Sequence, residues 1–363
     1  MGEGYSGIAV DGGKLYTMYR VSASKAGSKF DREVIVALDA QTGKTLWEDP
    51  YDAPFESGMQ MENGPGPHVT PLVLGNQVYT VGITGKFYCK DKNTGKTLWY
   101  HDLIKDYRSP MRGRGYSCSP VAYKQTVILP VGGTGQAMMA FNQKDGSVAW
   151  KKHNLTSSPS SPLIINVDGQ DQLVAFLGDV IAGLDPNNGD LLWSHPHKTD
   201  WGLNISTPVW SASDHLLFVS SAYNTGSRAI ELHQAGGRTS VAEKWFSSRM
   251  RVHIGTIIRL GDYIYASSGD FGPSFLTALD VKSGKVVWQD RSFARAQLLY
   301  ADNKLIILDE DGNLGLATVS PQGLKVLSRA SVLSNISWTP PTLSGTTLYA
   351  RDRKNIAAFS LGS

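Results

Sequence analysis

Five of the fifteen arginines lie in three short segments, each just before a stretch with strand-like alternation. Arginine binds carboxylate or phosphate groups through paired N–H donors, so arginines gathered on one surface favour an anion site. Tyrosine and asparagine side chains of the same segments could add hydrogen bonds. The candidate set is Arg112, Arg114, Tyr116, Asn204, Arg249, Arg251 and Arg295. The alternative interpretation is a rim of solvated charges that binds nothing.

The eight histidines show none of the local spacings, such as His-x-x-x-His, that fix a metal ion by themselves. His68 and His253 nevertheless occupy equivalent positions in two copies of a repeat, four copies apart. Two imidazoles with a neighbouring carboxylate could bind a divalent ion, with Zn²⁺ and Ca²⁺ as candidates. Such an ion could activate water or polarise an ester or phosphoryl oxygen. Histidines that only form hydrogen bonds are the alternative.

The elements that must position these side chains are defined by a repeated phrase of Asp, a turn, Gly and then Trp. The first copy runs from Asp39 through Gly43 to Trp47, and the second runs from Asp91 to Trp99. Glycine after a small polar residue supplies the positive φ of a tight hairpin, and the alternating apolar residues on either side predict strands. Six of the nine tryptophans occupy this one position: Trp47, Trp99, Trp150, Trp193, Trp245 (in a degenerate copy) and Trp288.

A first strand is expected near residues 6, 69, 117, 160, 206, 252, 294 and 337. Most intervals are close to about 45 residues, the length of a four-stranded propeller unit. The seventh unit lacks the tryptophan, and the eighth has room for about three strands. Units of this length bury both faces only when they stack radially. The sequence therefore predicts an all-β, eight-bladed β-propeller that forms one domain over residues 1–363, with the repeated tryptophans packed between blades.

In a propeller, the segments that enter the first strands face the axial channel. The arginine set would then line the mouth of that channel, and His68 and His253 would face each other across it. An axial cleft of this kind fits a small anionic ligand or a protein partner.

Composition excludes several classes of protein. The formal net charge is only +3, so a nucleic-acid binder is not expected. The sequence has no apolar run long enough for a membrane-spanning helix. The first residues, Met1–Tyr5, have neither the basic nor the apolar part of a signal peptide, so none is expected in this chain. Cys89 and Cys118 are not vicinal and are expected to be two small buried side chains.

The phrase Ala-Leu-Asp-x-x-[Thr/Ser]-Gly-Lys-x-x-Trp resembles the repeat of the PQQ-like, or quinoprotein-like, propellers. The chain also resembles the BamB-like proteins and other exported PQQ-like repeat proteins, the latter through Gly4–Gly7 and Arg114–Ser117. The resemblance implies an eight-bladed fold and a periplasmic or exported protein. Family members usually have an upstream segment that supplies the last strand of the final blade. Only five residues precede the first strand here, so the resemblance does not explain how that blade is completed.

In the quinoprotein dehydrogenases of this family, PQQ lies between a vicinal Cys-Cys disulfide and a tryptophan, beside Ca²⁺ ligands and a catalytic Asp. This sequence contains no Cys-Cys pair, and the tryptophan has no assignable counterpart. Acidic and amide residues of the entry loops match no motif; they are Glu56, Glu62, Asn63, Asp106, Asp200 and Asn204. PQQ binding is therefore not expected.

Three functions remain as hypotheses. The first is a binding or scaffold propeller whose ligand site lies at the channel mouth. The second is a metal-dependent hydrolase of an ester or phosphoester that uses channel histidines and acidic residues. The third is a PQQ- and Ca²⁺-dependent alcohol or sugar dehydrogenase. The missing Cys-Cys pair argues against the third, and the sequence does not separate the first from the second.

Overall fold

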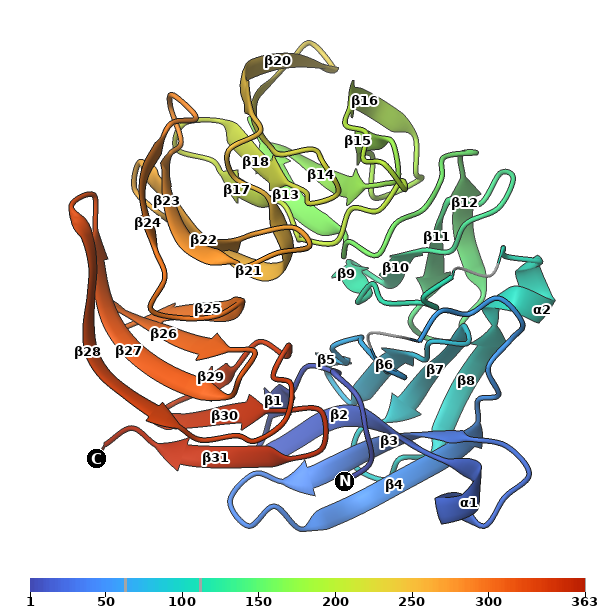
Figure 1. Cartoon of the computed structure of the whole chain (residues 1–363). Helices are drawn as coiled ribbons and strands as arrows, with labels where there is room; N and C mark the ends of the chain where they lie inside the picture. Colours follow the sequence, from blue (N-terminus) through green and yellow to red (C-terminus); the bar gives the residue numbers. More distant parts are fainter. Residues whose placement is uncertain (62–63, 111–112, 363) are drawn as a thin grey trace. The chain divides into compact units, whose positions relative to one another are not determined.

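The computed structural model describes residues 1–61, 64–110 and 113–362. These residues form eight antiparallel sheets in succession, seven with four strands and one with three (Figure 1). The fold is an eight-bladed β-propeller, as the repeat predicted. The chain divides into two compact units, one made of Met1–Asn154 with Pro341–Ser363 and the other of Leu155–Pro340. The prediction of a single domain stays a prediction.

The first unit holds blades 1, 2, 3 and 8. Blade 1 contains β1 (Ala9–Asp11), β2 (Lys14–Val21), β3 (Arg32–Asp39) and β4 (Thr45–Asp52). Blade 2 contains β5 (Leu72–Leu74), β6 (Gln77–Val81), β7 (Lys86–Asp91) and β8 (Thr97–Asp102). Blade 3 contains β9 (Val121–Tyr123), β10 (Thr126–Pro130), β11 (Met138–Asn142) and β12 (Val148–Lys152). Blade 8 contains β29 (Thr342–Ser344), β30 (Thr347–Arg351) and β31 (Ile356–Ser360).

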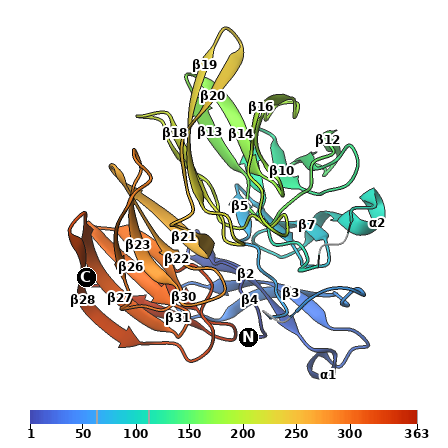
Figure 2. The same ribbon diagram turned by 45° about the horizontal axis from the view of Figure 1, so that its top comes forward.

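The second unit holds blades 4 to 7. Blade 4 contains β13 (Leu163–Val167), β14 (Gln170–Phe176), β15 (Val180–Leu184) and β16 (Leu191–Pro196). Blade 5 contains β17 (Val209–Ser211), β18 (Leu216–Ser220), β19 (Ser227–Ala235) and β20 (Arg238–Ser247), the last two forming the long hairpin seen in Figure 2. Blade 6 contains β21 (Val252–Leu260), β22 (Tyr263–Ser268), β23 (Phe275–Asp280) and β24 (Val286–Asp290). Blade 7 contains β25 (Ala296–Ala301), β26 (Lys304–Asp309), β27 (Asn313–Ser320) and β28 (Gly323–Ser331).

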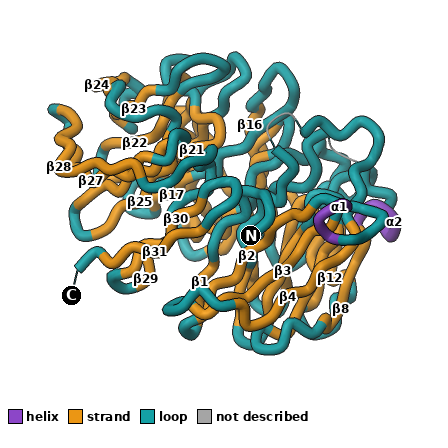
Figure 3. The backbone as a smooth tube through the Cα atoms, turned by 60° about the horizontal axis from the view of Figure 1, so that its bottom comes forward, coloured by secondary structure: helices purple, strands orange, loops and turns teal. Residues whose placement is uncertain are grey.

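Helix is confined to two short segments in loops of the first unit, α1 (Ala23–Ala26) and α2 (Leu103–Tyr107), drawn purple in Figure 3. Neither of these helices could cross a membrane, and they are the only ones among the residues that the structure describes. Every predicted first strand lies within five residues of an observed one. Blade 8 has the three strands that the sequence leaves room for, and blade 7 keeps four strands without the repeated tryptophan.

The repeated phrase joins one blade to the next through its tryptophan and its glycine. The indole N–H of Trp47 in blade 1 donates to the carbonyl of Lys92 in blade 2, at 3.0 Å. The glycine of blade 2, Gly95, has φ +73° and lies under that indole, so close that a Cβ there would be 2.6 Å from the ring. Corresponding hydrogen bonds join Trp99 to Gln143, Trp245 to Val281 and Trp288 to Ser320.

Trp193 departs from this pattern. Its indole N–H donates to the side-chain oxygen of Gln172 in its own blade, at 2.6 Å. The next blade explains the difference, because its β19–β20 hairpin replaces the short turn ending in glycine on which Trp47, Trp99 and Trp245 lie. Trp150 is buried in the first unit.

The first and last blades of the chain are held together inside the first unit. Strand β29 lies beside β1, and the Thr342 hydroxyl donates to the carbonyl of Ile8 at 2.8 Å. The guanidinium of Arg351 on β30 is buried and donates to the carbonyls of Ser6 and Met18 and to the Thr17 hydroxyl. Blade 8 is thus attached to blade 1 by side-chain hydrogen bonds and remains a three-stranded sheet.

Candidate functional site

The predicted rim residues of the first unit are partly in its core. Tyr116 is buried, and its hydroxyl donates to the carbonyl of Val131 at 3.0 Å. His68 is half-buried and stacks on the ring of Tyr5 at 5.9 Å. Burial, and then the charge of Arg114, lower the pKa of His68 to about 4, so its imidazole is neutral at pH 7. Arg112, Glu62 and Asn63 lie outside the described residues.

In the second unit, Asp270 brings two of the predicted arginines together. One carboxylate oxygen of Asp270 lies 3.8 Å from the guanidinium of Arg251, and its carbonyl accepts a hydrogen bond from Arg295 at 3.0 Å. Arg249 is exposed. Because an acidic side chain already faces Arg251, this group of arginines is less free to hold a small anion than the sequence alone indicated.

Asn204 is fully buried and holds two loops of blades 4 and 5 together. Its amide N–H donates to the carbonyl of Leu177, and its side-chain oxygen accepts from the Ser221 hydroxyl at 2.5 Å. Asn204 therefore stabilises these two loops from inside the protein, and its side chain is not accessible from the solvent.

His253 contacts Tyr223, whose hydroxyl lies 2.6 Å from its Nε2. Among residues 1–61, 64–110 and 113–362, neither His68 nor His253 belongs to a group of three possible ligands within its own unit. The two histidines lie in different units, and the shared-metal hypothesis stays a prediction.

Three aromatic rings gather beside His253, and we call them the aromatic patch: Trp201, Tyr223 and Phe271. The ring centroids are 5.2 Å apart for Trp201 and Tyr223, and 5.5 Å apart for Trp201 and Phe271. Trp201 is 60% exposed and Phe271 is 68% exposed, whereas Tyr223 is 4% exposed beneath them. The exposed rings of Trp201 and Phe271 therefore pack on the buried ring of Tyr223, and Tyr223 is hydrogen-bonded to His253.

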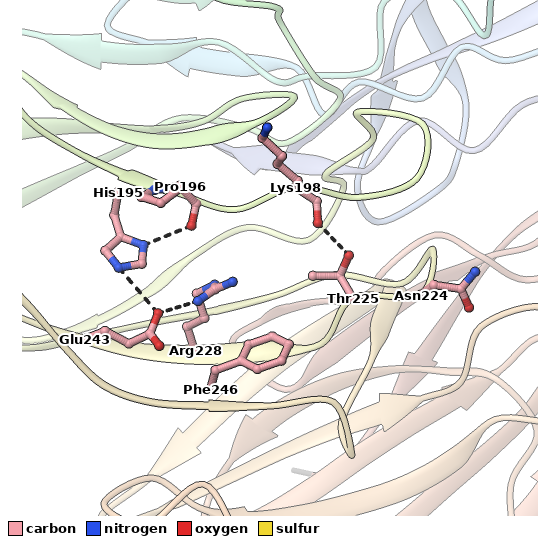
Figure 4. A pocket seen from close by; sticks show the side chains of 8 residues that line it. All are labelled: His195, Pro196, Lys198, Asn224, Thr225, Arg228, Glu243 and Phe246. Carbon is pink, nitrogen blue, oxygen red and sulfur yellow. Dashed lines mark hydrogen bonds and ion pairs between the residues drawn. The ribbon is translucent and has the colours of Figure 1, made fainter.

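An open cleft of about 610 Å³, lined by charged, polar and apolar side chains, lies between β16 and the β19–β20 hairpin (Figure 4). Its lining residues are His195, Pro196, Lys198, Asn224, Thr225, Arg228, Glu243 and Phe246. Figure 4 shows His195 and Arg228 converging on Glu243, with 3.4 Å between His195 Nε2 and the carboxylate.

Asn224 connects the cleft to the aromatic patch. It lines the cleft, and its amide group donates to the carboxylate of Asp200, the neighbour of Trp201, at 2.6 Å. Its backbone N–H donates to Asp270, the neighbour of Phe271, at 3.0 Å. Asn224 thus ties one wall of the cleft to the two loops that carry the exposed rings.

The buried His197 fixes the position of Arg228, one of the residues that line the cleft. Burial lowers the pKa of His197 to about 3, with smaller contributions from the charges of Arg228 and His195. Arg228 Nε donates to its Nδ1 at 3.1 Å, so the neutral ring carries its proton on Nε2, which faces the Ser221 hydroxyl. The Arg228 side chain is therefore fixed between His197 and Glu243.

The cysteines do not fit the clamp that the quinoprotein resemblance implies for PQQ. Cys89 lies on β7 and Cys118 precedes β9, and both are buried free thiols, as expected for small core side chains. Burial raises the pKa of the Cys89 thiol to about 12, which makes it unreactive at neutral pH.

A family model described as outer membrane protein assembly factor BamB matches residues 31–290, well over half of the sequence. The chain belongs to the BamB family. A BamB of Moranella endobia is 23% identical over 312 residues, which cover 86% of this chain and 66% of that protein. A BamB of Yersinia pestis is 23% identical over 297 residues, which cover 77% of this chain and 70% of that protein. The chain thus spans about two thirds of the length of these relatives.

The crystal structure of BamB from Moraxella catarrhalis has the same fold, with a TM-score of 0.62 and 16% sequence identity. The alignment covers 97% of this chain and 94% of that one. The PQQ-like and BamB-like resemblance drawn from the repeat is thereby confirmed.

Sequence reasoning did not find the aromatic patch of this BamB-family chain, although one signal pointed to it. Trp201 is one of three tryptophans outside the repeat position, and it lies in a loop between Asp200 and Gly202. Phe271 is in a similar loop, between Asp270 and Gly272. Large apolar residues in such polar, glycine-containing loops have no strand to pack on, which indicates exposure.

Proposed function

We propose that this protein is a non-enzymatic scaffold that binds a protein partner during outer-membrane protein assembly, in the periplasm and without PQQ. The observation that carries the proposal is the exposed pair Trp201 and Phe271 on the loops of the second unit. The name of its relatives, outer membrane protein assembly factor, supplies the biological setting. Family resemblance to exported proteins supports the periplasmic location.

The aromatic patch has the properties of a protein-binding hot spot. Aromatic side chains in the centre of an interface contribute most of its binding energy, because they bury a large apolar area at little entropic cost. The buried ring of Tyr223, bonded to His253, restricts the motion of the rings above it. A partner would therefore meet a preorganised surface.

The adjoining cleft indicates the chemistry of the partner. Arg228 and His195 face it with a single carboxylate, Glu243, among the lining residues, whereas Figure 4 shows the ammonium of Lys198 directed away from Glu243. Since Arg228 and His195 already contact Glu243, the exposed ammonium of Lys198, at the edge of the cleft, is the positive group that an acidic side chain of the partner would meet. We infer that the partner presents an apolar side chain to the aromatic patch and, along the same segment, an acidic side chain to the cleft.

Removal of both exposed rings tests this proposal. We expect the double variant Trp201→Ala, Phe271→Ala to weaken partner binding by roughly 1,000-fold, because each hot-spot aromatic contributes about 2 kcal/mol. The variant Leu191→Ala, Leu327→Ala is the matched control, since it also removes two exposed apolar side chains of the second unit, 49% and 46% exposed. The control is expected to bind as the unaltered protein does.

The measurement is complementation of a bacterial strain that lacks its own BamB, scored by the amounts of outer-membrane proteins, together with photo-crosslinking from position 201. The proposal holds if the double variant fails to complement, the control complements, and the crosslinked partner belongs to the outer-membrane assembly machinery. It is wrong if the double variant complements fully or if position 201 crosslinks no such protein while the control position 191 does. Equal folding of all variants is checked by circular dichroism.

A further inference from the structure

A second group of side chains, separate from the aromatic patch and the cleft, lies where blades 4 and 5 meet. We call it the Asp-His-His cluster: Asp168, His215 and His233. Asp168 is in the turn between β13 and β14, His215 is in the turn between β17 and β18, and His233 is on β19. One possible ligand atom from each of these residues lies within 4.8 Å of the other two.

The distances in the cluster suit a transition-metal ion. One carboxylate oxygen of Asp168 is 3.4 Å from Nδ1 of His215, and the other is 3.7 Å from Nδ1 of His233. Ligands of a tetrahedral Zn²⁺ ion at 2.0–2.1 Å are separated by roughly 3.3 Å from one another. The two distances from the carboxylate to the imidazoles are thus within a few tenths of an ångström of that separation, and all three ligand atoms lie within 4.8 Å of one another, so small rotations of the side chains would let them surround an ion.

The His215 nitrogen that faces Asp168 lacks a hydrogen-bond partner among the described residues. This Nδ1 atom is buried and makes no hydrogen bond with any residue that the structure describes, although the carboxylate is only 3.4 Å away. A buried polar nitrogen without a partner costs free energy. An ion between the imidazole and the carboxylate would satisfy both groups.

The backbone holds the three ligands in position. Asp168 and His215 both have positive φ, 47° and 55°, which is uncommon for residues other than glycine and marks a specific turn. The second Asp168 oxygen also accepts a hydrogen bond from the backbone N–H of Gln234 at 2.8 Å. The two imidazole rings lie 4.4 Å apart with an angle of 36° between their planes.

An outer carboxylate completes the arrangement. Glu231 lies 3.9 Å from Nε2 of His233, the ring nitrogen that points away from Asp168. A carboxylate that accepts a hydrogen bond from the second nitrogen of a metal-ligating histidine orients the ring, and Glu231 would have to approach by roughly 1 Å to form that bond. His233 and Asp168 are partly exposed, so water could fill the fourth position.

We propose that Asp168, His215 and His233 form a binding site for a single Zn²⁺ ion or a similar divalent transition-metal ion, with an open fourth position. The donor set of two imidazoles and one carboxylate favours such an ion over Ca²⁺ or Mg²⁺, which prefer oxygen ligands only. The bound ion links the β13–β14 turn of blade 4 to two elements of blade 5. This site is independent of the proposed partner surface.

Calorimetric titration with ZnCl₂ tests the site, using full-length protein without a histidine tag after dialysis against EDTA. We expect one ion per chain, and we expect the dissociation constant of His215→Ala, His233→Ala to rise by at least about 100-fold. Asp168→Asn should weaken binding by roughly 10-fold or more, and asparagine tolerates the positive φ of this turn. With Co²⁺, the unaltered protein should show the visible absorption of a four-coordinate ion, and the double variant should not.

Two controls separate this site from other histidines. His195→Ala removes an imidazole that also faces a carboxylate in the same unit, 3.4 Å from Glu243, and should bind Zn²⁺ unchanged. His68→Ala, His253→Ala tests the other histidine pair. The proposal is overturned if the unaltered protein binds no Zn²⁺ at micromolar concentration, or if the His215 and His233 double variant binds as tightly as the unaltered protein. Melting temperatures in EDTA confirm that each variant is folded.

Discussion

Single buried side chains couple this fold to pH, and His197 is the clearest case. Its pKa falls to about 3 in the folded protein, whereas an unperturbed histidine titrates near 6.5. Between these values the unfolded chain binds a proton that the folded chain does not. The free energy of unfolding therefore decreases as the pH is lowered from 6.5 toward 3, and the contribution of His197 is fully present only above pH 6.5.

The variant His197→Gln should remove this dependence, because glutamine can keep a donor and an acceptor but does not titrate. Between pH 6.5 and 4 we expect the unaltered protein to lose on the order of 3 kcal/mol more stability than the variant. The measurement is urea unfolding at a series of pH values. His195→Gln, two residues earlier and less buried, serves as the control, and equal pH dependence of His197→Gln and the unaltered protein would contradict the assignment.

At the scale of the elements, the glycine of the repeated phrase has two separate roles. It adopts a positive φ in the turn, and it makes room for the tryptophan of the preceding blade. Gly95 has both roles, because a Cβ there would lie 2.6 Å from the Trp47 ring. Gly43 holds the same position in blade 1 with φ +69°, yet among the described residues no atom lies within 4 Å of its added Cβ.

These two glycines therefore form a matched pair of variants. Gly43→Ala should cost about 1 kcal/mol, the strain of a left-handed backbone with a side chain. Gly95→Ala should cost a further 1–3 kcal/mol or so, because the indole must shift out of its packed position. Chemical unfolding measures both, and near-equal losses would show that the indole contact contributes little to the junction of blades 1 and 2.

At the scale of the whole chain, the repeat made the fold predictable and left the sites largely unpredictable. Trp47, Gly95 and their counterparts recur at regular intervals, so the sequence shows the same contact between neighbouring blades several times. The aromatic patch and the Asp-His-His cluster have no such redundancy. Asp168 and His233 are 65 positions apart in different hairpins, and only the stacking of blades 4 and 5 brings them together. Tyr116 and Asn204 look like polar rim residues in the sequence, but packing buries both.

The attachment of the last blade is the feature of the chain for which the sequence offered no explanation, and the structure assigns it to Arg351. This guanidinium is buried, and it joins blade 8 to residues of blade 1 that lie more than 330 positions earlier. Burial lowers its pKa to about 10, so it is still charged at neutral pH. Its three acceptors would be left without a charged donor if the side chain were replaced.

Arg351→Met should therefore destabilise the protein by about 1–3 kcal/mol, because three buried acceptors lose their donor, an effect partly offset by removal of the buried Nε and Nη2 atoms, which have no hydrogen-bond partner among the described residues. Arg353, two residues later, is the control. It forms an accessible ion pair with Glu3 at 2.8 Å, and pairs of that kind contribute less than about 1 kcal/mol, so Arg353→Met should have little effect. Urea unfolding compares the two variants. If Arg351→Met were as stable as Arg353→Met, the contacts of β29 with β1, and not the buried arginine, would be what holds blade 8 in place.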